Sequence, residues 1–244
     1  MRLVLGLLLA VLSAPALAQV PPKGLDTKVA EGTVGPYVAG LNITVRDHVS
    51  IVAAHYYYAK TGLDIPLKVA VQGDTFLFDE PHGGHFELHL TNADASAPRP
   101  LNFYKSTGLA GTWTREGKTL PVVFGFSSGY PGPAPDRWYA AITSESDAQF
   151  EGRVRTFLRC VLLSDVDQAA RAVSWPLIVN GKQRITIHNR RELAKRWKTL
   201  FTPTALRALR KAIPHEMFVR NGMAMVANGA VWFDAGGAKV LNLP

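Results

Sequence analysis

The chain has 244 residues and a formal net charge of +8, and 47% of its residues are hydrophobic against 19% charged. This share of apolar side chains can bury a core and excludes a disordered or low-complexity chain. The single cysteine, Cys160, excludes a disulfide scaffold and a zinc site built from cysteines, and we expect it to be a buried, inert thiol. The length is that of one large domain or two ordinary ones.

Residues 1–18 have the pattern of a secretory signal peptide. Arg2 precedes the apolar run Leu3–Leu12, and an Ala-x-Ala pattern ends at Ala18. The run is shorter than the roughly 20 residues that a membrane-spanning helix needs. We therefore expect cleavage after Ala18 and a periplasmic or secreted protein without a transmembrane span.

Residues 19–126 are predicted to form an all-β domain, either a small antiparallel barrel or a sandwich. Short apolar runs recur at about 8–12-residue spacing and are separated by turn signals such as Gln72-Gly73-Asp74. The expected strands are Asn42–Val45, Ser50–Tyr58, Ile65–Val71, Thr75–Asp79, His85–Thr91, Leu101–Tyr104, Gly111–Thr114 and Leu120–Phe126.

Residues 127–135 are predicted to be a linker between domains. The stretch Ser127–Pro135 has no charge and contains three prolines and two glycines. Because proline and glycine interrupt both helices and central strands, we expect irregular backbone here.

Residues 136–244 are predicted to be an α+β domain that begins with two helices. The first has one apolar face, formed by Phe150, Val154, Phe157, Leu158, Val161 and Leu162. A second helix, Asp165–Val173, is expected to be capped by Ser164 and to end before Ser174-Trp175-Pro176.

A hairpin, two further helices and an antiparallel tail are expected next. Asn180-Gly181 predicts a two-residue type I′ turn. Asn189 with Glu192 predicts the start of the third helix, and Thr202 before Pro203 that of the fourth. The tail strands are predicted at Met217–Arg220, Met223–Ala227, Ala230–Asp234 and Ala238–Leu243, with Gly-containing turns between them.

This order of elements, together with local runs, resembles the NTF2-like (cystatin-like) α+β cone. The runs are Leu158–Asp165, Val173–Leu177, Leu200–Pro203 and Gly222–Phe233, and the chain looks like uncharacterised bacterial exported proteins with this C-terminal domain. The resemblance implies helices packed on one face of a bent sheet. Because this fold carries enzymes, binding proteins and structural modules, it leaves the function open.

No motif in the sequence predicts a catalytic residue, a metal site or a cofactor. His82, His85 and His89 have a ligand-like spacing, but two of them on one strand would lie about 13 Å apart, too far to share an ion. His55 from another strand could complete a set with His82 and His85, although turn or surface histidines are the favoured interpretation.

A ligand pocket inside the cone is one hypothesis, because aromatic walls with a few polar groups are typical of ligand sites. Its candidate residues are Trp175, His188, Trp197, Trp232 and Asp234. The competing interpretation is that the tryptophans are core residues and that His188 lies at a helix start.

The charge is concentrated in one segment. Residues 182–211 hold ten basic residues and one acidic residue, whereas residues 19–126 have a net charge of −1. A polyanion is the partner that such a field attracts, and the candidate contacts are Arg191, Lys195, Lys198, Arg207 and Lys211. Lipopolysaccharide, anionic lipid and acidic wall polymers are the polyanions of a cell envelope, while a merely solvated helix face remains the alternative. Nucleic acid is not expected, because the chain lacks a recognised nucleic-acid-binding pattern.

The most favoured function is therefore a non-enzymatic binding or interaction module of the cell envelope. The first alternative is a small-ligand binder or enzyme that uses the cone pocket. The second is a periplasmic inhibitor or immunity protein, ranked last because a basic face repels basic wall enzymes.

Overall fold

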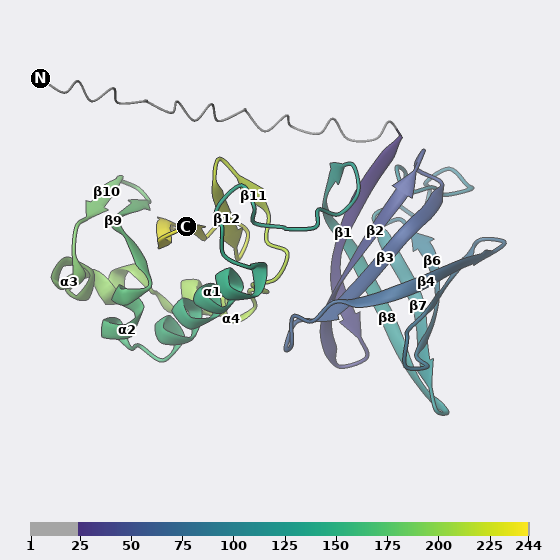
Figure 1. The fold of residues 1–244 in the computed structure, drawn as a ribbon, viewed down its shortest axis with the longest axis horizontal. Coiled ribbons are helices and arrows are strands. Elements are labelled where there is room, and N and C mark those ends of the chain that lie inside the picture. Colours follow the sequence, from purple (N-terminus) through teal and green to yellow (C-terminus); the bar gives the residue numbers. More distant parts are fainter. Residues whose placement is uncertain (1–23, 244) are drawn as a thin grey trace, which may run out of the picture.

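The computed structural model describes residues 24–243, and the predicted signal peptide 1–18 therefore lies outside the described residues. Within this range the chain forms a β-barrel (residues 25–131) followed by a mixed sheet with helices, here called the second half (residues 132–243). The two parts lie side by side in Figure 1.

Eight antiparallel strands form the barrel, which confirms the predicted antiparallel all-β part and selects the barrel over the sandwich. Each strand pairs with the next, and the last strand closes the barrel on the first. The strands are β1 (Leu25–Val34), β2 (Tyr37–Arg46), β3 (Ser50–Tyr58), β4 (Ile65–Gln72), β5 (Thr75–Asp79), β6 (His85–Thr91), β7 (Gly108–Arg115) and β8 (Lys118–Pro131).

Alternating side chains fill the barrel interior. In β6, Phe86, Leu88 and Leu90 are buried, while Glu87 and His89 between them are exposed. This period of two is what an antiparallel strand with one solvated face requires. The interior is therefore a packed core, in which Phe78 is fully buried.

Two features of the barrel correct the predictions. Strand β1 was not predicted, because its inward positions are small and carry little apolar signal, as Ala30 and Gly32 show. Conversely, the predicted strand Leu101–Tyr104 is a turn. Its apolar residue Phe103 is buried because the turn packs it against Phe76 in the barrel core, with ring centroids 5.4 Å apart.

The predicted linker is also corrected, because β8 continues through residues 127–131. These residues pair with the start of β1, as in Lys28↔Gly129 and Asp26↔Pro131. Proline is tolerated at this point because it ends the strand. Only residues 132–135 of the predicted linker connect the barrel to the second half.

The second half has four helices and a six-stranded sheet in the order β10-β9-β14-β13-β12-β11. Strands β9 and β14 are parallel and the other pairs are antiparallel, so the sheet is mixed. The elements are α1 (Asp147–Leu162), α2 (Val166–Arg171), β9 (Val173–Asn180), β10 (Ile185–Ile187), α3 (Arg190–Leu200), α4 (Pro203–Arg210), β11 (Val219–Arg220), β12 (Met223–Val226), β13 (Val231–Asp234) and β14 (Gly237–Asn242).

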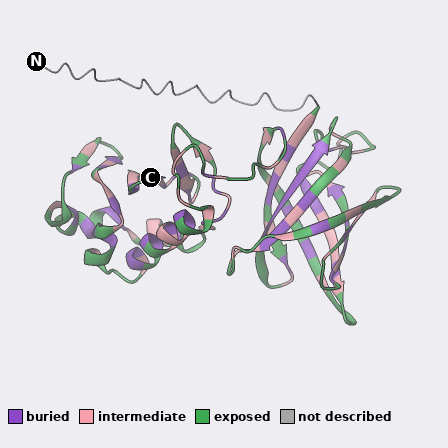
Figure 2. Ribbon diagram, in the orientation of Figure 1, coloured by how far each residue is buried: buried purple, intermediate pink, exposed green. Residues whose placement is uncertain are grey.

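One apolar core joins the helices to the sheet. The buried faces of the helices contribute residues such as Phe157 and Leu193, and the sheet contributes Phe233, whose ring meets that of Phe157 at 5.5 Å. Figure 2 shows buried residues along one side of each longer helix. Cys160 lies in this core, as predicted.

Local signals predicted the helix starts well, with one exception. Asn189 and Thr202 cap α3 and α4 as predicted, each accepting a hydrogen bond from the third residue that follows. The cap of α2 is Asp165 rather than Ser164, which has a positive φ of 59°. The helix ends at Arg171, so the run 174–176 lies in strand β9 instead of terminating a helix.

One predicted turn agrees with the structure and another does not. Asn221 and Gly222 both have positive φ between the paired residues Arg220 and Met223, which confirms the glycine-containing turn predicted between the first two tail strands. Between β9 and β10, however, Val179 pairs with Ile185. Asn180-Gly181 therefore begins a longer loop and does not form the predicted two-residue turn. Within residues 24–243 no helix is long and apolar enough to cross a membrane.

Closure of the barrel predicts that alanine substitutions at two glycines have opposite effects on the free energy of unfolding. A Cβ at Gly32 would overlap the backbone carbonyl of Val123 on the closing strand, whereas a Cβ at Gly152 in α1 meets open space. We expect Gly32→Ala to lower the free energy of unfolding by about 1–3 kcal/mol. We expect Gly152→Ala to raise it by about 0.5–1 kcal/mol, because alanine favours the helix.

Urea unfolding of both variants beside the parent chain measures the difference. Equal stability of the two variants would contradict the close approach of β1 to β8.

Candidate functional site

Part of the outer face of β1–β3 is buried, although it faces away from the barrel core. Every residue from Ala39 to Val45 in β2 is buried, so both faces of that strand are covered. On the outer face, Thr27 is 0% exposed and Asn42 is 2% exposed. A polar face can be buried in this way only if another part of the chain satisfies it, and the second half does so.

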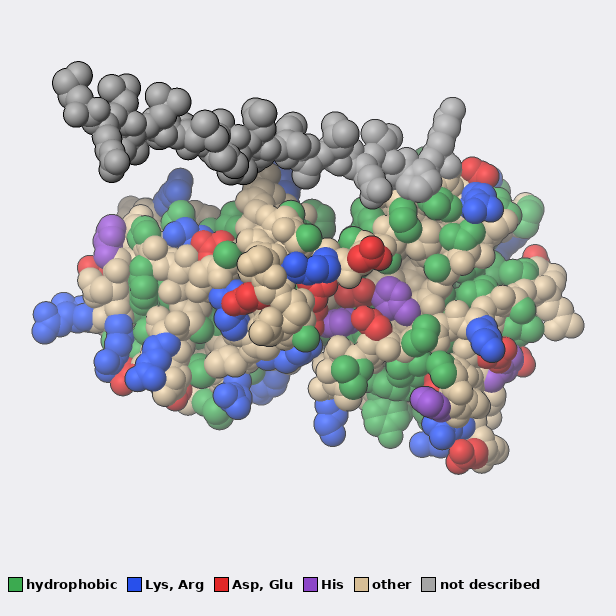
Figure 3. All heavy atoms as spheres, in the orientation of Figure 1, with side chains coloured by type: hydrophobic (Ala, Val, Ile, Leu, Met, Phe, Trp, Pro, Cys, Tyr) green, Lys and Arg blue, Asp and Glu red, His purple; other side chains and the backbone are tan. Residues whose placement is uncertain are grey.

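Histidine and acidic side chains gather where the two halves meet, as Figure 3 shows. We call the set His55, Asp64, Glu151, His215 and Glu216 the interface cluster. The first two come from β3 and the loop after it, the third from α1, and the last two from the connection between α4 and β11.

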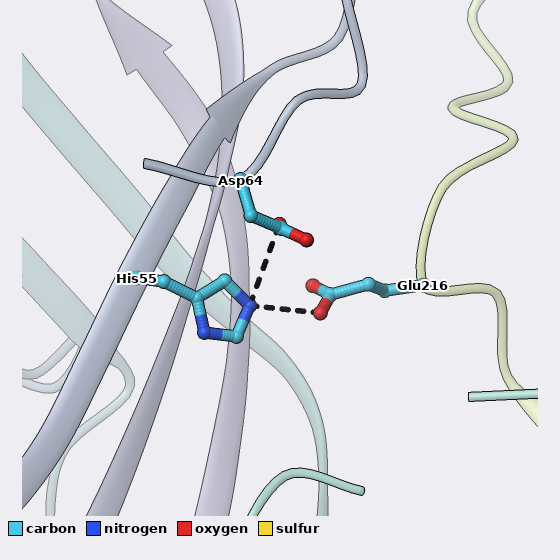
Figure 4. Close-up of side chains that lie close together, drawn as sticks. All are labelled: His55, Asp64 and Glu216. Carbon is cyan, nitrogen blue, oxygen red and sulfur yellow. Dashed lines mark hydrogen bonds and ion pairs between the residues drawn. The ribbon is translucent and has the colours of Figure 1, made fainter. Parts of the chain in front are cut away.

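His55 is the centre of the part of the cluster drawn in Figure 4. Its Nε2 lies 2.8 Å from Oε1 of Glu216 and 3.6 Å from Oδ1 of Asp64. The amide nitrogen of Asn42 in β2 donates to the other carboxylate oxygen of Glu216. The Glu216 side chain is 7% exposed, so a carboxylate of the second half is inserted against the barrel wall.

His215 links two carboxylates. Its Nε2 lies 3.0 Å from Oδ1 of Asp64, and its Nδ1 lies 2.9 Å from Oε2 of Glu151. The ring of Tyr57 in β3 meets the His215 ring edge-on, with centroids 4.2 Å apart. His215 is therefore enclosed by groups of both halves.

Glu151 is almost completely buried and fully hydrogen-bonded. It accepts from the hydroxyl of Tyr139 at 2.9 Å, from Arg155 at 3.0 Å and from the backbone N–H of Glu216 at 3.2 Å. Arg155 also donates to the carbonyl of Pro214. These bonds hold the segment that carries His215 and Glu216 against helix α1.

The backbone at the cluster adopts a rare conformation. Glu216 has φ of +46°, a left-handed conformation that costs free energy for a residue other than glycine. On the barrel side, Gly62 has φ of +58°, and a Cβ there would collide with the guanidinium of Arg155. The cluster thus depends on a strained glutamate and on one glycine that permits close approach.

The carboxylates set the charge state of the histidines. Burial lowers the pKa of His55, but its hydrogen bond to Glu216 and the charges of Glu216 and Asp64 outweigh burial and raise it above its ordinary value. For His215, burial lowers the pKa, whereas the hydrogen bonds to Asp64 and Glu151 raise it to about 9.

Asp64 responds in the opposite direction. Burial raises its pKa, but the hydrogen bond to His215 and the charges of His215 and His55 hold it below its ordinary value. With both histidines protonated, three cations including Arg155 face the three carboxylates of the interface cluster. In that protonation state the charges of the cluster balance.

Two open spaces lie between the halves, and the first of them adjoins the cluster. A cleft of about 450 Å³ is lined by His215 and Glu216 together with Val29 of the barrel. A wider groove of about 1090 Å³ lies between Tyr37 and Tyr58 of the barrel and the end of α4. None of the five predicted pocket residues lines either space.

The structure places the five predicted pocket residues in different environments. Trp197 is in the core and packs on Phe201 at 4.5 Å, whereas His188 is exposed before α3. Asp234 accepts hydrogen bonds from Ser174 and from the turn after β13, which is a structural role. Trp175 and Trp232 are half-buried in strands β9 and β13.

The predicted basic residues are all exposed, and four of the five lie on the outer helices. Arg191, Lys195 and Lys198 are on α3, Arg207 is on α4, and Lys211 follows α4 directly. Figure 3 shows Lys and Arg side chains over this part of the second half. Among residues 24–243, no carboxylate forms an ion pair with any of these five residues.

The remaining histidines stay apart from the cluster. His85 lies between Asp79, at 2.6 Å, and Glu87, at 3.5 Å, on the barrel surface. His82 and His89 are exposed, and neither they nor His85 approach His55 in the described hydrogen bonds and ion pairs. The set of His55 with His82 and His85 is therefore not formed.

Comparison of the chain with protein-family models, curated proteins and solved structures finds no match. We therefore infer function from the geometry of the interface cluster and from the exposed basic helices.

Because His215 is enclosed by both halves, we expect its substitution to destabilise the protein strongly. His215→Ala leaves Glu151 and Asp64 without their shared partner, and breaking a buried pair in this way costs about 3–5 kcal/mol. We expect the free energy of unfolding in urea to fall by about that amount. His188→Ala is the control, because an exposed substitution changes stability by less than about 0.5 kcal/mol. A loss as small as that of the control would contradict the proposed role of the cluster in joining the halves.

Proposed function

We propose that this is an exported, non-enzymatic binding protein of the cell envelope that attaches to lipid surfaces bearing phosphate groups. The observation that carries the proposal is the basic face of the outer helices, formed by the exposed side chains of Arg191, Lys195 and Lys198 on α3 and Arg207 on α4. Lys211, the fifth predicted contact, is exposed but lines the spaces between the halves. The pattern of the signal peptide at 1–18 supports export, which places the protein among anionic envelope lipids.

The basic side chains of α3 lie along one side of the helix. Arg191 and Lys195 are four residues apart in α3, and Lys198 follows three residues later, a spacing that puts all three on one side of the helix. The opposite side is buried through Leu193 and Trp197. The charged side chains are thus free to meet a surface while the apolar side holds the helix in place.

The energetics favour a charged surface as the partner. Each Lys or Arg near an anionic membrane contributes about 1 kcal/mol, so the four on α3 and α4 together provide substantial attraction. This attraction is screened within about 8–10 Å at physiological ionic strength. A flat array of headgroups also needs no cavity in the protein, in agreement with the exposed position of these four side chains.

We further propose that the second half is an NTF2-like cone that acts as the scaffold of this face. The order of its elements supports this, since two helices, a hairpin, two helices and a series of strands share one core. The alternative of a ligand inside the cone finds less support, because Trp197 belongs to that core and His188 lies outside it.

Charge reversal tests the proposal directly. In Arg191→Glu/Lys195→Glu/Lys198→Glu we expect at least a tenfold loss of binding to phosphatidylglycerol vesicles at low salt, measured by cosedimentation. The matched control is Lys68→Glu/Lys105→Glu/Lys118→Glu, which makes the same change of charge at exposed positions of the barrel.

Comparison of the two triple variants distinguishes binding through the basic helix face from binding caused by the net charge of the whole protein. Equal losses would show that overall charge, and not this face, causes binding. Undetectable binding of the parent chain at low salt would overturn the proposal.

A further inference from the structure

Four polar side chains meet at one point of the interface between the halves. His55 Nε2, a carboxylate oxygen of Asp64 and a carboxylate oxygen of Glu216 all lie within 4.8 Å of one another. The side-chain amide of Asn42 contacts both His55, at 3.4 Å, and Glu216. We propose that these residues bind a divalent transition-metal cation, Zn²⁺ or Mn²⁺, between the barrel and the second half.

The spacing of the donor atoms fits such an ion. Two ligands about 2.1 Å from a tetrahedral ion are about 3.4 Å apart. His55 Nε2 lies 2.8 Å from Glu216 and 3.6 Å from Asp64, which brackets that value. The carboxylate oxygens of Asp64 and Glu216 also lie within 4.8 Å of one another, so an ion among the three donors requires His55 and Glu216 to move apart by about 0.6 Å.

Asn42 provides a second and independent observation. It is only 2% exposed, and its Oδ1 is buried without a hydrogen-bond partner among the described residues. A buried polar atom left unpaired calls for an explanation, and a bound ion or water is a common one. Because the two ends of an amide exchange by a flip of the group, Oδ1 can replace the nitrogen that faces Glu216 and His55.

The charges and supporting contacts also suit a cation. When the ion displaces the proton of His55 Nε2, Asp64 and Glu216 supply two negative charges, which match a divalent ion. His215 contacts the Oδ1 of Asp64 and is itself held by Glu151, which is the arrangement of outer groups that orients metal ligands. The Asp64 side chain is 51% exposed, so an ion can reach the site from solvent.

The donor types narrow the choice of ion. One imidazole nitrogen joins two carboxylates and an amide oxygen, and no thiolate is present among these four residues. Imidazole favours zinc and other late transition metals, whereas carboxylate and carbonyl oxygens favour manganese, magnesium and calcium. The mixed set selects Zn²⁺ or Mn²⁺ over the purely oxygen-binding ions.

Titration calorimetry on the tag-free chain after EDTA treatment tests the site, with Zn²⁺, Mn²⁺ and Ca²⁺ in separate runs. We expect one Zn²⁺ or Mn²⁺ per chain and weaker Ca²⁺ binding. We expect Glu216→Gln and Asp64→Asn each to weaken binding at least about 100-fold, more than the 10- to 100-fold that outer groups contribute. Visible absorption of Co²⁺ bound at the site should report imidazole ligation and disappear in His55→Ala.

His85→Ala is the matched control, because His85 also lies between two carboxylates but on the barrel surface. We expect it to leave the binding unchanged. Should Glu216→Gln fail to fold, Asp64→Asn alters a half-exposed side chain and decides the question.

Absence of one-to-one binding for every ion in the parent chain would overturn the proposal. So would binding that survives Asp64→Asn but is lost in His85→Ala. The inference is independent of the basic face, and the triple variant Arg191→Glu/Lys195→Glu/Lys198→Glu should bind the ion as the parent chain does.

Discussion

The balance of buried charge between the two halves is the constraint on which the rest of the structure depends. Glu151 and Glu216 lose their hydration at the interface, and cations and neutral hydrogen-bond donors placed beside them compensate for that loss. His55 comes from the barrel and Arg155 from helix α1, so compensation requires both halves in one relative position. The outer face of β1–β3 can be polar and buried for the same reason.

The sequence predicted those parts of the fold that short segments determine. The bounds of β3, β5 and β6, and the caps Asn189 and Thr202, agree with the structure because alternation and capping act over a few residues. Strand β1 and the end of β8 were missed because each is stabilised by pairing with the other, about 100 residues away. From their immediate neighbours in sequence, Gly129 and Pro131 indicate irregular backbone. Pairing with β1 makes them part of a strand.

The interface cluster could not be predicted from the sequence, for a related reason. Its members are separated by up to about 160 residues, and no spacing pattern connects them. The one available signal was Glu151, an acid beside the apolar stripe of its helix. The exposure of Arg191, Lys195 and Lys198 on the side of α3 opposite Leu193, by contrast, was predicted correctly, because the periodicity of a single helix determines it. The binding of a polyanion to them remains a prediction.

The position of β14 has a consequence for the order of assembly. This strand lies between β9 and β13 in the middle of its sheet, although it is the last strand along the chain. The barrel can close once residue 131 is available, whereas the sheet of the second half has no centre until residues 237–242 arrive. During synthesis, the strands of the barrel are therefore complete before the sheet of the second half can form, and until then the polar outer face of the barrel lies in water.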